Sequence, residues 1–169
     1  KNENLLVSVV MNCYNSEKYL KQAKDSVLEQ TYQNWEIIFW DNQSSDESAK
    51  IFKSYNDKRL HYFLASEFTK LGEARNLAVA CANGEWIGFL DCDDIWLPRK
   101  LENQINIVNQ EDSDLGIVYG QCLVINSSSK TSSKWENRQF KYENKTVLRA
   151  LPEGNVFKKI LKFNFIPLL

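Results

Sequence analysis

The sequence reads Trp86-Ile87-Gly88-Phe89-Leu90-Asp91-Cys92-Asp93-Asp94 where a short apolar run leads straight into three carboxylates. Such a run is typical of a strand that is covered on both faces. Carboxylates this close repel one another unless a cation or solvent relieves them, and their hard oxygens suit Mg²⁺ or Mn²⁺. The stretch therefore predicts a metal site at the end of a strand. The alternative is an exposed acidic turn ahead of a helix that Pro98 opens.

Outward from this stretch, four more apolar runs predict strands over residues 5–11, 35–40, 60–64 and 115–125. Residues at helical spacing separate the runs, most regularly over 74–82. The resulting β-α-β-α-β-α-β-α-β order predicts an α/β fold with a mostly parallel central sheet flanked by helices. Ligands of open α/β sheets bind at the carboxyl ends of the strands, so the polar residues that follow the strands should converge there.

The predicted helix starts carry signals of their own. Asn15-Ser16 and, further on, Ser44-Ser45 can each cap a helix. Arg75 is expected in the first turn of the third helix, where an arginine beside a helix N-terminus suits a diphosphate. Pairing of Arg75 with Glu73 or Asp91 is an equally open alternative.

The turn after the first strand, Asn12-Cys13-Tyr14-Asn15, has no glycine fingerprint, and the chain has no GxxxxGK[ST] loop. These absences disfavour a Rossmann dinucleotide site and a P-loop. The turn instead presents amides and an aromatic ring, which can stack on a base and hydrogen-bond its edge. A half-buried Tyr14 and a capping Asn15 are the plainer interpretation. Trp96, just after the acidic cluster, is expected to pack beneath it rather than to support a sugar ring.

Composition excludes several classes of protein. The 169 residues include 21 basic and 22 acidic ones, so nucleic-acid binding is not expected. No apolar run approaches the ~18 residues of a membrane span. The cysteines, Cys13, Cys81, Cys92 and Cys122, form no CxxC pair, which argues against zinc and favours free thiols in a reducing cytoplasm. His61 is the single histidine and lies in a predicted strand, so a structural role is expected.

The character of the chain changes near residue 126. We expect residues 1–126 to form the α/β domain and residues 127–169 a second region, with short helices over 144–161. Residues 138–162 hold seven Lys or Arg and two Glu. Two interpretations of this basic stretch stay open: peripheral association with an anionic membrane surface, and a solvated face that balances the acidic remainder.

Six segments occur in order that together resemble glycosyltransferase family 2 proteins of the GT-A type. They are VSVVMNCYN over 7–15, SVLEQTY over 26–32, WDNQSSD over 40–46, GEARN over 72–76, GEWI over 84–87 and LDCDD over 90–94. Each segment alone is a weak signal, but their order and spacing are specific. The resemblance covers residues 5–125 and implies a Rossmann-like GT-A nucleotide-sugar-binding domain, with LDCDD similar to the family's DxD motif.

The resemblance also implies which residues bind the donor, a nucleotide-diphospho-sugar and in particular a UDP-sugar. These residues are Asn12, Tyr14, Asp41, Asn42, Arg75, Asp91 and Asp93. The first four would hold the base and ribose, and Arg75 would lie near the donor phosphates or the acidic loop. Asp93 would be the principal ligand of Mn²⁺ or Mg²⁺, with Asp91 at the metal or the ribose and Asp94 supporting the site.

The sequence departs from the family pattern in two places, and it also lacks a recognisable catalytic base. Asn42 stands where several uridine-using relatives have Asp, so the identity of the base is open, and Asn12-Cys13 stands where Pro-Thr is common. The family's catalytic base lies further along the chain, and none of Glu136, Glu143 and Glu153 matches a base motif. We therefore expect residues 127–169 to be a truncated part of the acceptor side, and donor binding without efficient transfer.

These observations predict a metal-dependent, inverting glycosyltransferase. It would transfer sugar to a hydroxyl of a glycan or lipid-linked acceptor in cell-envelope polysaccharide biosynthesis, in the cytoplasm or at the inner face of the membrane. A nucleotidyltransferase is one alternative, although the Gly-rich basic loop that such enzymes usually carry is missing. A nucleotide-sugar-binding module without turnover is the other, and an assay with an added acceptor separates it.

Overall fold

The computed structural model describes residues 4–110, 115–120, 125, 140–142 and 145–147. The chain divides into two units between Gly116 and Ile117. In the second unit, β5 (Phe140–Tyr142) pairs antiparallel with β6 (Lys145–Val147). None of the helices in the described part has both the length and the apolar composition that a membrane crossing needs.

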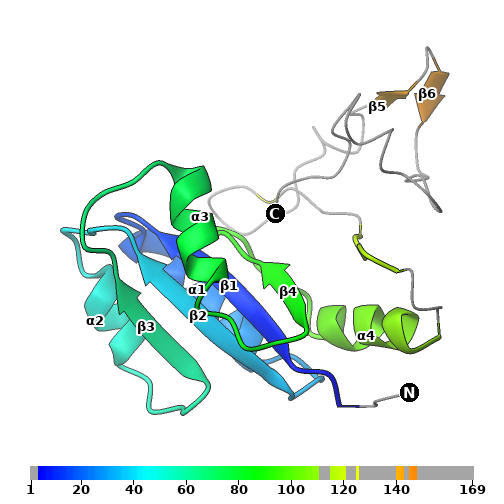
Figure 1. Cartoon of the computed structure of the whole chain (residues 1–169), viewed down its shortest axis with the longest axis horizontal. Helices are drawn as coiled ribbons and strands as arrows, with labels where there is room; N and C mark the ends of the chain where they lie inside the picture. Colours follow the sequence, from blue (N-terminus) through cyan, green and yellow to red (C-terminus); the bar gives the residue numbers. More distant parts are fainter. Residues whose placement is uncertain (1–3, 111–114, 121–124, 126–139, 143–144, 148–169) are drawn as a thin grey trace. The chain divides into compact units, whose positions relative to one another are not determined.

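The first unit is built on a parallel sheet (Figure 1). Its elements are β1 (Val7–Cys13), α1 (Glu17–Leu28), β2 (Trp35–Asp41), α2 (Ser48–Lys53), β3 (Leu60–Leu64), α3 (Leu71–Val79), β4 (Trp86–Phe89) and α4 (Lys100–Gln110). The strand order is β3-β2-β1-β4, and every neighbouring pair is parallel. The predicted α/β class and parallel sheet are confirmed. All four strands therefore end at the same edge of the sheet, here called the carboxyl edge, and begin at the amino edge.

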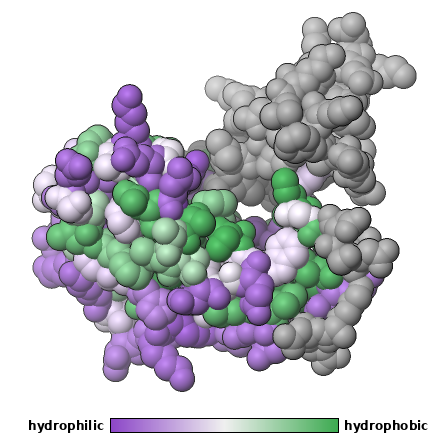
Figure 2. Space-filling model, in the orientation of Figure 1, coloured by the Kyte–Doolittle hydropathy of each residue, from purple (hydrophilic) through white to green (hydrophobic). Residues whose placement is uncertain are grey.

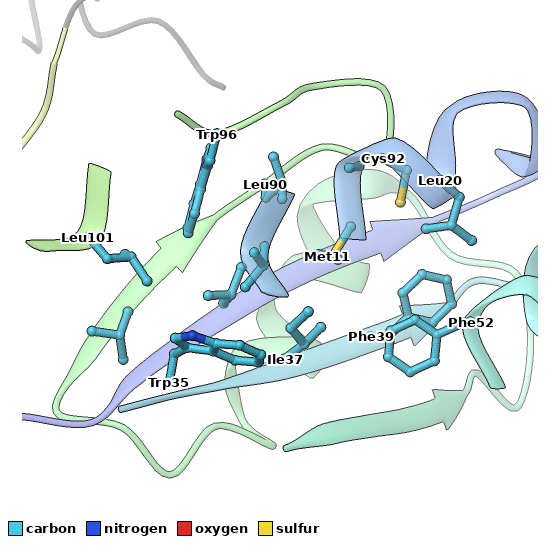
Figure 3. Close-up of a cluster of buried hydrophobic side chains, with 14 of the residues drawn as sticks. Met11, Leu20, Trp35, Ile37, Phe39, Phe52, Leu90, Cys92, Trp96 and Leu101 are labelled. Carbon is cyan, nitrogen blue, oxygen red and sulfur yellow. The ribbon is translucent and has the colours of Figure 1, made fainter. Parts of the chain in front are cut away.

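Helices cover the two faces of the sheet unequally. Side chains of α1, α2 and α4 form the larger core with one face, where Phe39 and Phe52 stack with ring centroids 4.1 Å apart (Figure 3). On the other face α3 packs on β1 and β2, with Ala78 buried in a smaller cluster. Thin cover on this face leaves Leu77 and Phe89 exposed, and Figure 2 shows hydrophobic side chains at the surface in the region of α3 and β4.

The loop that follows β4 is fixed to the sheet and to α1. Gln30 donates from Nε2 to the carbonyl of Leu97 at 2.8 Å and accepts a backbone N–H of α4 at 3.0 Å. Ser26 Oγ accepts the backbone N–H of Trp96 at 3.1 Å. Trp96 is buried on Gly88, where any Cβ would lie 2.9 Å from the indole ring. The packing role predicted for Trp96 is confirmed.

The predicted start of the second helix is wrong. The helix α2 begins at Ser48, not after Ser44-Ser45. The reason is that Ser44 is already engaged in a turn: its N–H donates to the Asp41 carboxylate at 2.8 Å, and its hydroxyl accepts the N–H of Asn15 at 3.1 Å. A capping role would compete for the Ser44 hydroxyl, which already accepts the N–H of Asn15.

The predicted position of Arg75 within its helix is also wrong. Because α3 begins at Leu71 and ends at Val79, Arg75 lies in its second turn. The orphan amides of a helix N-terminus are confined to its first turn, so the argument that places Arg75 beside them does not hold.

Two predictions for the C-terminal part are wrong where the structure describes it. Residues 115–120 form no strand, since the glycines at 116 and 120 weaken a strand interior. Residues 145–147 lie in β6 rather than in the helix predicted over 144–161, and β-branched Thr146 and Val147 favour a strand. The remainder of 144–161 lies outside the described residues, as does Cys122.

Candidate functional site

Two segments predicted to bind the donor meet at the carboxyl edge. Since β1 and β4 are neighbours, the turn after Cys13 and the loop after Leu90 leave the sheet side by side. The Cys92 thiol donates to the carbonyl of Asn12 at 3.3 Å, across 80 residues of sequence. Beside this contact the Asn12 side-chain amide nitrogen is buried without a hydrogen-bond partner. Buried amides are normally satisfied, so an orphaned donor marks a place where a ligand acceptor or water is expected.

The acidic loop carries three carboxylates in three environments. Asp91 Oδ1 accepts from Arg75 Nη2 at 2.8 Å, so the ion pair of the second interpretation is present. Asp93 is exposed. Burial, and then the charges of Asp93 and Asp91, raise the pKa of Asp94. The loop therefore stores charge repulsion that a cation would relieve.

The residues of this loop suit one type of metal site and not another. Among the described residues no group of three or more His, Cys, Asp and Glu side chains is arranged to hold a metal ion. A closed cage made of protein ligands is thus absent from that part of the chain. Mg²⁺ in nucleotide sites instead takes one or two carboxylates and completes its shell with phosphate oxygens and water. Exposed Asp93, with the second oxygen of Asp91, fits this open type.

Asp41 and Asn42 are buried and bonded within the protein. The Asp41 carboxylate accepts the N–H of Ser44 at 2.8 Å and the hydroxyl of Tyr62 at 2.7 Å. Asn42 donates from Nδ2 to the Thr69 carbonyl at 2.8 Å and accepts the Thr69 N–H at 3.1 Å. Their exposed fractions are 1% and 6%. The two residues thus join the end of β2 to its own turn and to the loop ahead of α3.

Two aromatic rings lie at the surface of this edge. Tyr14 and Phe68 make an edge-to-face contact with centroids 4.9 Å apart, and both are more than half exposed. Phe68 belongs to the loop that the Asn42–Thr69 hydrogen bonds hold in place. Exposed aromatic pairs are suited to stacking on a planar ligand. The structure brings Asn12, Tyr14 and the acidic loop to one edge, and it adds Phe68, which sequence reasoning missed.

Two thiols are buried beneath the site. Hydrogen bonding to Cys92, and then to Ser48, Ser44 and Ser16, lowers the pKa of Cys13 to about 6 in spite of its burial. The same contact, together with burial, raises the pKa of the Cys92 thiol. Cys13, Cys81 and Cys92 are free cysteines, as predicted.

The amino edge holds a different kind of acid. Glu36 is 6% exposed and accepts from Ser8 Oγ at 2.6 Å and from the N–H of Asn83 at 2.8 Å. Its carboxylate also pairs with His61 Nε2 at 3.2 Å. Burial opposes the charge, but these hydrogen bonds lower the pKa of Glu36. The structural role expected for His61 is consistent with this network, which ties β1, β2 and β3 together.

The fold and this edge match a known family. A family model described as glycosyl transferase family 2 matches residues 8–163. The chain belongs to glycosyltransferase family 2. As a family 2 member it has the GT-A fold of its structural neighbours, with the VSVVMNCYN, WDNQSSD and LDCDD segments on β1, at the end of β2 and in the loop that follows β4.

Three similar proteins illustrate the range of the family. The chain is 38% identical over 128 residues to the Escherichia coli UDP-Glc:alpha-D-GlcNAc-diphosphoundecaprenol beta-1,3-glucosyltransferase WfgD, covering 75% of this chain and 49% of that protein. It is 33% identical to an uncharacterized glycosyltransferase of Methanocaldococcus jannaschii, covering 93% of this chain and 57% of that one. The S. aureus TarS 1–349 structure matches with a TM-score of 0.59 and 28% identity, covering 62% of this chain and 32% of that one. The chain thus spans about half the length of the first two of these relatives.

Sequence reasoning also missed what the SVLEQTY segment does in this family 2 chain. Ser26 and Gln30 bind the backbone of the loop that carries the acidic cluster, over a sequence distance of about 70 residues. Gln30 is buried and a buried amide needs partners, but its burial is not visible in the sequence, so no local signal pointed to this backbone clamp.

Proposed function

We propose that the first unit of this chain binds a nucleotide-diphospho-sugar at the carboxyl edge, as the donor half of an inverting glycosyltransferase. The observation that carries the proposal is the Cys92–Asn12 contact, which holds the acidic loop against the Tyr14 turn. One nucleoside diphosphate places its base and its metal-bound phosphates a short distance apart, so the surface that binds the base and the site that binds the metal need to lie this close. UDP is the first nucleotide to test, because the E. coli relative is named for a UDP-Glc donor.

Tyr14 and Asn12 are the proposed contacts for the base and ribose. Tyr14 offers an exposed ring face, and Asn12 has an amide N–H to donate. Asp41 and Asn42 contribute indirectly, because their polar atoms already bind the turn after β2 and Thr69. We expect them to fix the shape of the base pocket. Because Asn42 carries an amide, the identity of the base is left to experiment.

Asp93, with Asp91, is the proposed protein share of a Mn²⁺ or Mg²⁺ site. Such an ion supplies charge that stabilises a departing nucleoside diphosphate. Asp94 supports the site from a half-buried position. Arg75 holds Asp91 through the 2.8 Å ion pair and keeps a guanidinium close to the position proposed for the phosphates. A guanidinium presents several donors to phosphate oxygens, so it can bind both groups.

Transfer with inversion requires a general base that removes the proton of the acceptor hydroxyl. Glu136, Glu143 and Glu153 lie outside the described residues, and no base is assigned. The proposed acceptor is a glycan or a lipid-linked sugar of cell-envelope polysaccharide synthesis, in keeping with the diphosphoundecaprenol substrate in the name of the E. coli relative. The same proposal places the reaction in the cytoplasm, with the basic stretch 138–162 in peripheral contact with the membrane. It also divides the chain into a donor domain over 1–126 and an acceptor-side region over 127–169.

Thermal unfolding in the presence of UDP, GDP, CDP, ADP and dTDP, each with and without Mn²⁺, tests the donor site. A ligand at ~100 times its Kd adds about 2.7 kcal/mol of stability and raises Tm by several degrees. We expect one nucleotide to do so, with Mn²⁺ only. Asp93→Asn should abolish the shift, whereas Glu29→Gln, an exposed acid at the far end of α1, should keep it. A shift that Asp93→Asn leaves intact, or no shift with any nucleotide, contradicts the proposal.

A further inference from the structure

The buried residues Cys13 and Cys92 lie at the ends of neighbouring segments, since Cys13 is the last residue of β1 and Cys92 stands in the loop that follows β4. Val10 pairs with Phe89 in the parallel ladder of β1 and β4, and the two cysteines stand three residues further along each segment. Paired strands lie about 4.8 Å apart. A disulfide needs Cα atoms separated by about 4.4–6.8 Å, so this register is compatible with one.

Both side chains also lie on the same face of the sheet. They belong to the larger core cluster, together with Met11 and Leu20, and Figure 3 shows Cys92 next to these two residues. The Cys92 sulfur lies 3.3 Å from the carbonyl oxygen of Asn12, the residue directly before Cys13. The register of the two segments and the direction of the two side chains are therefore both compatible with a disulfide.

Cys81 provides the internal contrast. It lies just beyond the end of α3, on the opposite face, and its thiol donates to the carbonyl of Leu77 at 3.5 Å. A disulfide from Cys81 to either of the paired cysteines would have to cross the sheet. Any selective oxidation among these three residues should therefore spare Cys81.

We propose that Cys13 and Cys92 form a reversible disulfide under peroxide, which ties the acidic loop to the turn that carries Tyr14. One molecule of hydrogen peroxide transfers an oxygen atom to one thiol, which gives a sulfenic acid and water. The second sulfur attacks the sulfenic sulfur, its proton leaves with the hydroxyl as water, and the S–S bond forms. Two thiols thus give up two electrons and two protons, and a dithiol reductant reverses the step.

The bond would change the site in two ways. It removes the thiol proton that Cys92 donates to the Asn12 carbonyl. It also fixes the spacing between the Tyr14 turn and Asp91–Asp93 at the length of a disulfide. The expected effect on nucleotide binding rests on the proposed function, whereas formation of the crosslink does not.

Peptide mass spectrometry of the 169-residue chain tests the crosslink. Reduced, folded protein is treated with an equimolar amount of hydrogen peroxide, quenched, unfolded and alkylated with N-ethylmaleimide. Two of the four thiols should become unreactive, with one Cys13–Cys92 peptide lighter by two hydrogens and lost again after dithiothreitol. Cys81→Ser should keep this product, and Cys13→Ser or Cys92→Ser should abolish it. Alkylation of both residues after oxidation, or the mixture of pairings that the urea-unfolded chain gives, overturns the proposal.

A binding titration of UDP with Mn²⁺ tests the coupling to the site. The oxidised chain should bind about fivefold more weakly or worse, and reduction should restore the affinity. Equal affinity of the two forms would overturn the coupling. A reduced chain that binds no nucleotide would count against the proposed function, while the mass measurement would still decide the disulfide.

Discussion

Two acids of the parallel sheet, Glu36 at the amino edge and Asp94 at the carboxyl edge, are in opposite environments. Glu36 accepts hydrogen bonds from Ser8 and Asn83 and lies 3.2 Å from His61 Nε2, so donors stabilise its buried carboxylate. At the carboxyl edge, Asp94 is half-buried beside two further carboxylates. The first arrangement stabilises the fold, whereas the repulsion among the carboxylates in the second lowers stability until a bound cation relieves it. The difference is what we expect if Glu36 belongs to a structural network and Asp94 to the proposed ligand site.

The largest expected effect is at the amino edge. Glu36→Ala leaves Ser8 Oγ and the N–H of Asn83 buried without their acceptor, so we expect the free energy of unfolding to fall by about 3 kcal/mol. Urea unfolding measures this loss. Asp93→Ala, which removes an exposed acid from the other edge, should change stability by less than about 0.5 kcal/mol.

Nucleotide affinity gives the reverse pattern for the same two variants. Below its Tm, Glu36→Ala should bind nucleotide as the wild type does, whereas Asp93→Ala should lose binding. If Glu36→Ala stayed as stable as the wild type, or if it lost nucleotide binding while folded, the division of the two edges would be wrong.

A smaller loss is expected from the clamp that holds the acidic loop. Gln30→Ala removes both side-chain contacts to the backbone of Leu97 and Leu101, which should lower the free energy of unfolding by about 2 kcal/mol. Gln22→Ala is the matched control, since Gln22 is exposed on α1, the helix that ends two residues before Gln30, and its loss should cost less than about 0.5 kcal/mol. Equal losses in the two variants would mean that Gln30 is no clamp.

The smallest effect is in the pH dependence of stability without metal, and its sign differs between the edges. The pKa of Glu36 is lowered on folding, so its contribution is present above the unfolded pKa of 4.5 and is lost as pH falls. The pKa of Asp94 is raised above 3.8, so its contribution is present at low pH and is lost as pH rises through the folded pKa.

Denaturant midpoints from pH 3 to pH 6 in EDTA measure the two slopes. Glu36→Gln should reduce the rise of stability with pH. Asp94→Asn should make that rise steeper, because it removes a contribution of opposite sign. The same direction of change in both variants would contradict the opposition of the two edges.

Local pattern was enough to predict the framework of the first unit and not enough to predict its polar contacts. Strands over β1 to β4 follow from apolar runs, and the packing of Trp96 from its size and place. The role of Gln30 depends on backbone groups about 70 residues away, which no local spacing encodes. The start of α2 depends in the same way on the Asn15–Ser44 contact.

The candidate site shows the same limit. The motifs placed Asn12, Tyr14 and the acidic loop at one edge, where the structure has them. They could not show that Asp41 and Asn42 are bonded within the protein, or that Phe68 meets Tyr14, because these depend on how three loops pack. The strand predicted over 115–120 does not form, and Gly116 and Gly120, which interrupt the apolar run, are the sequence feature that disfavours it.

Hydrogen–deuterium exchange with and without UDP and Mn²⁺ tests most directly that the carboxyl edge is the ligand edge. The account predicts slower exchange in residues 12–16, 66–72 and 91–95, with no change in 34–37 and 83–86 at the amino edge. Protection confined to the amino edge, or nucleotide binding that slows exchange in none of the three carboxyl-edge loops, would contradict it.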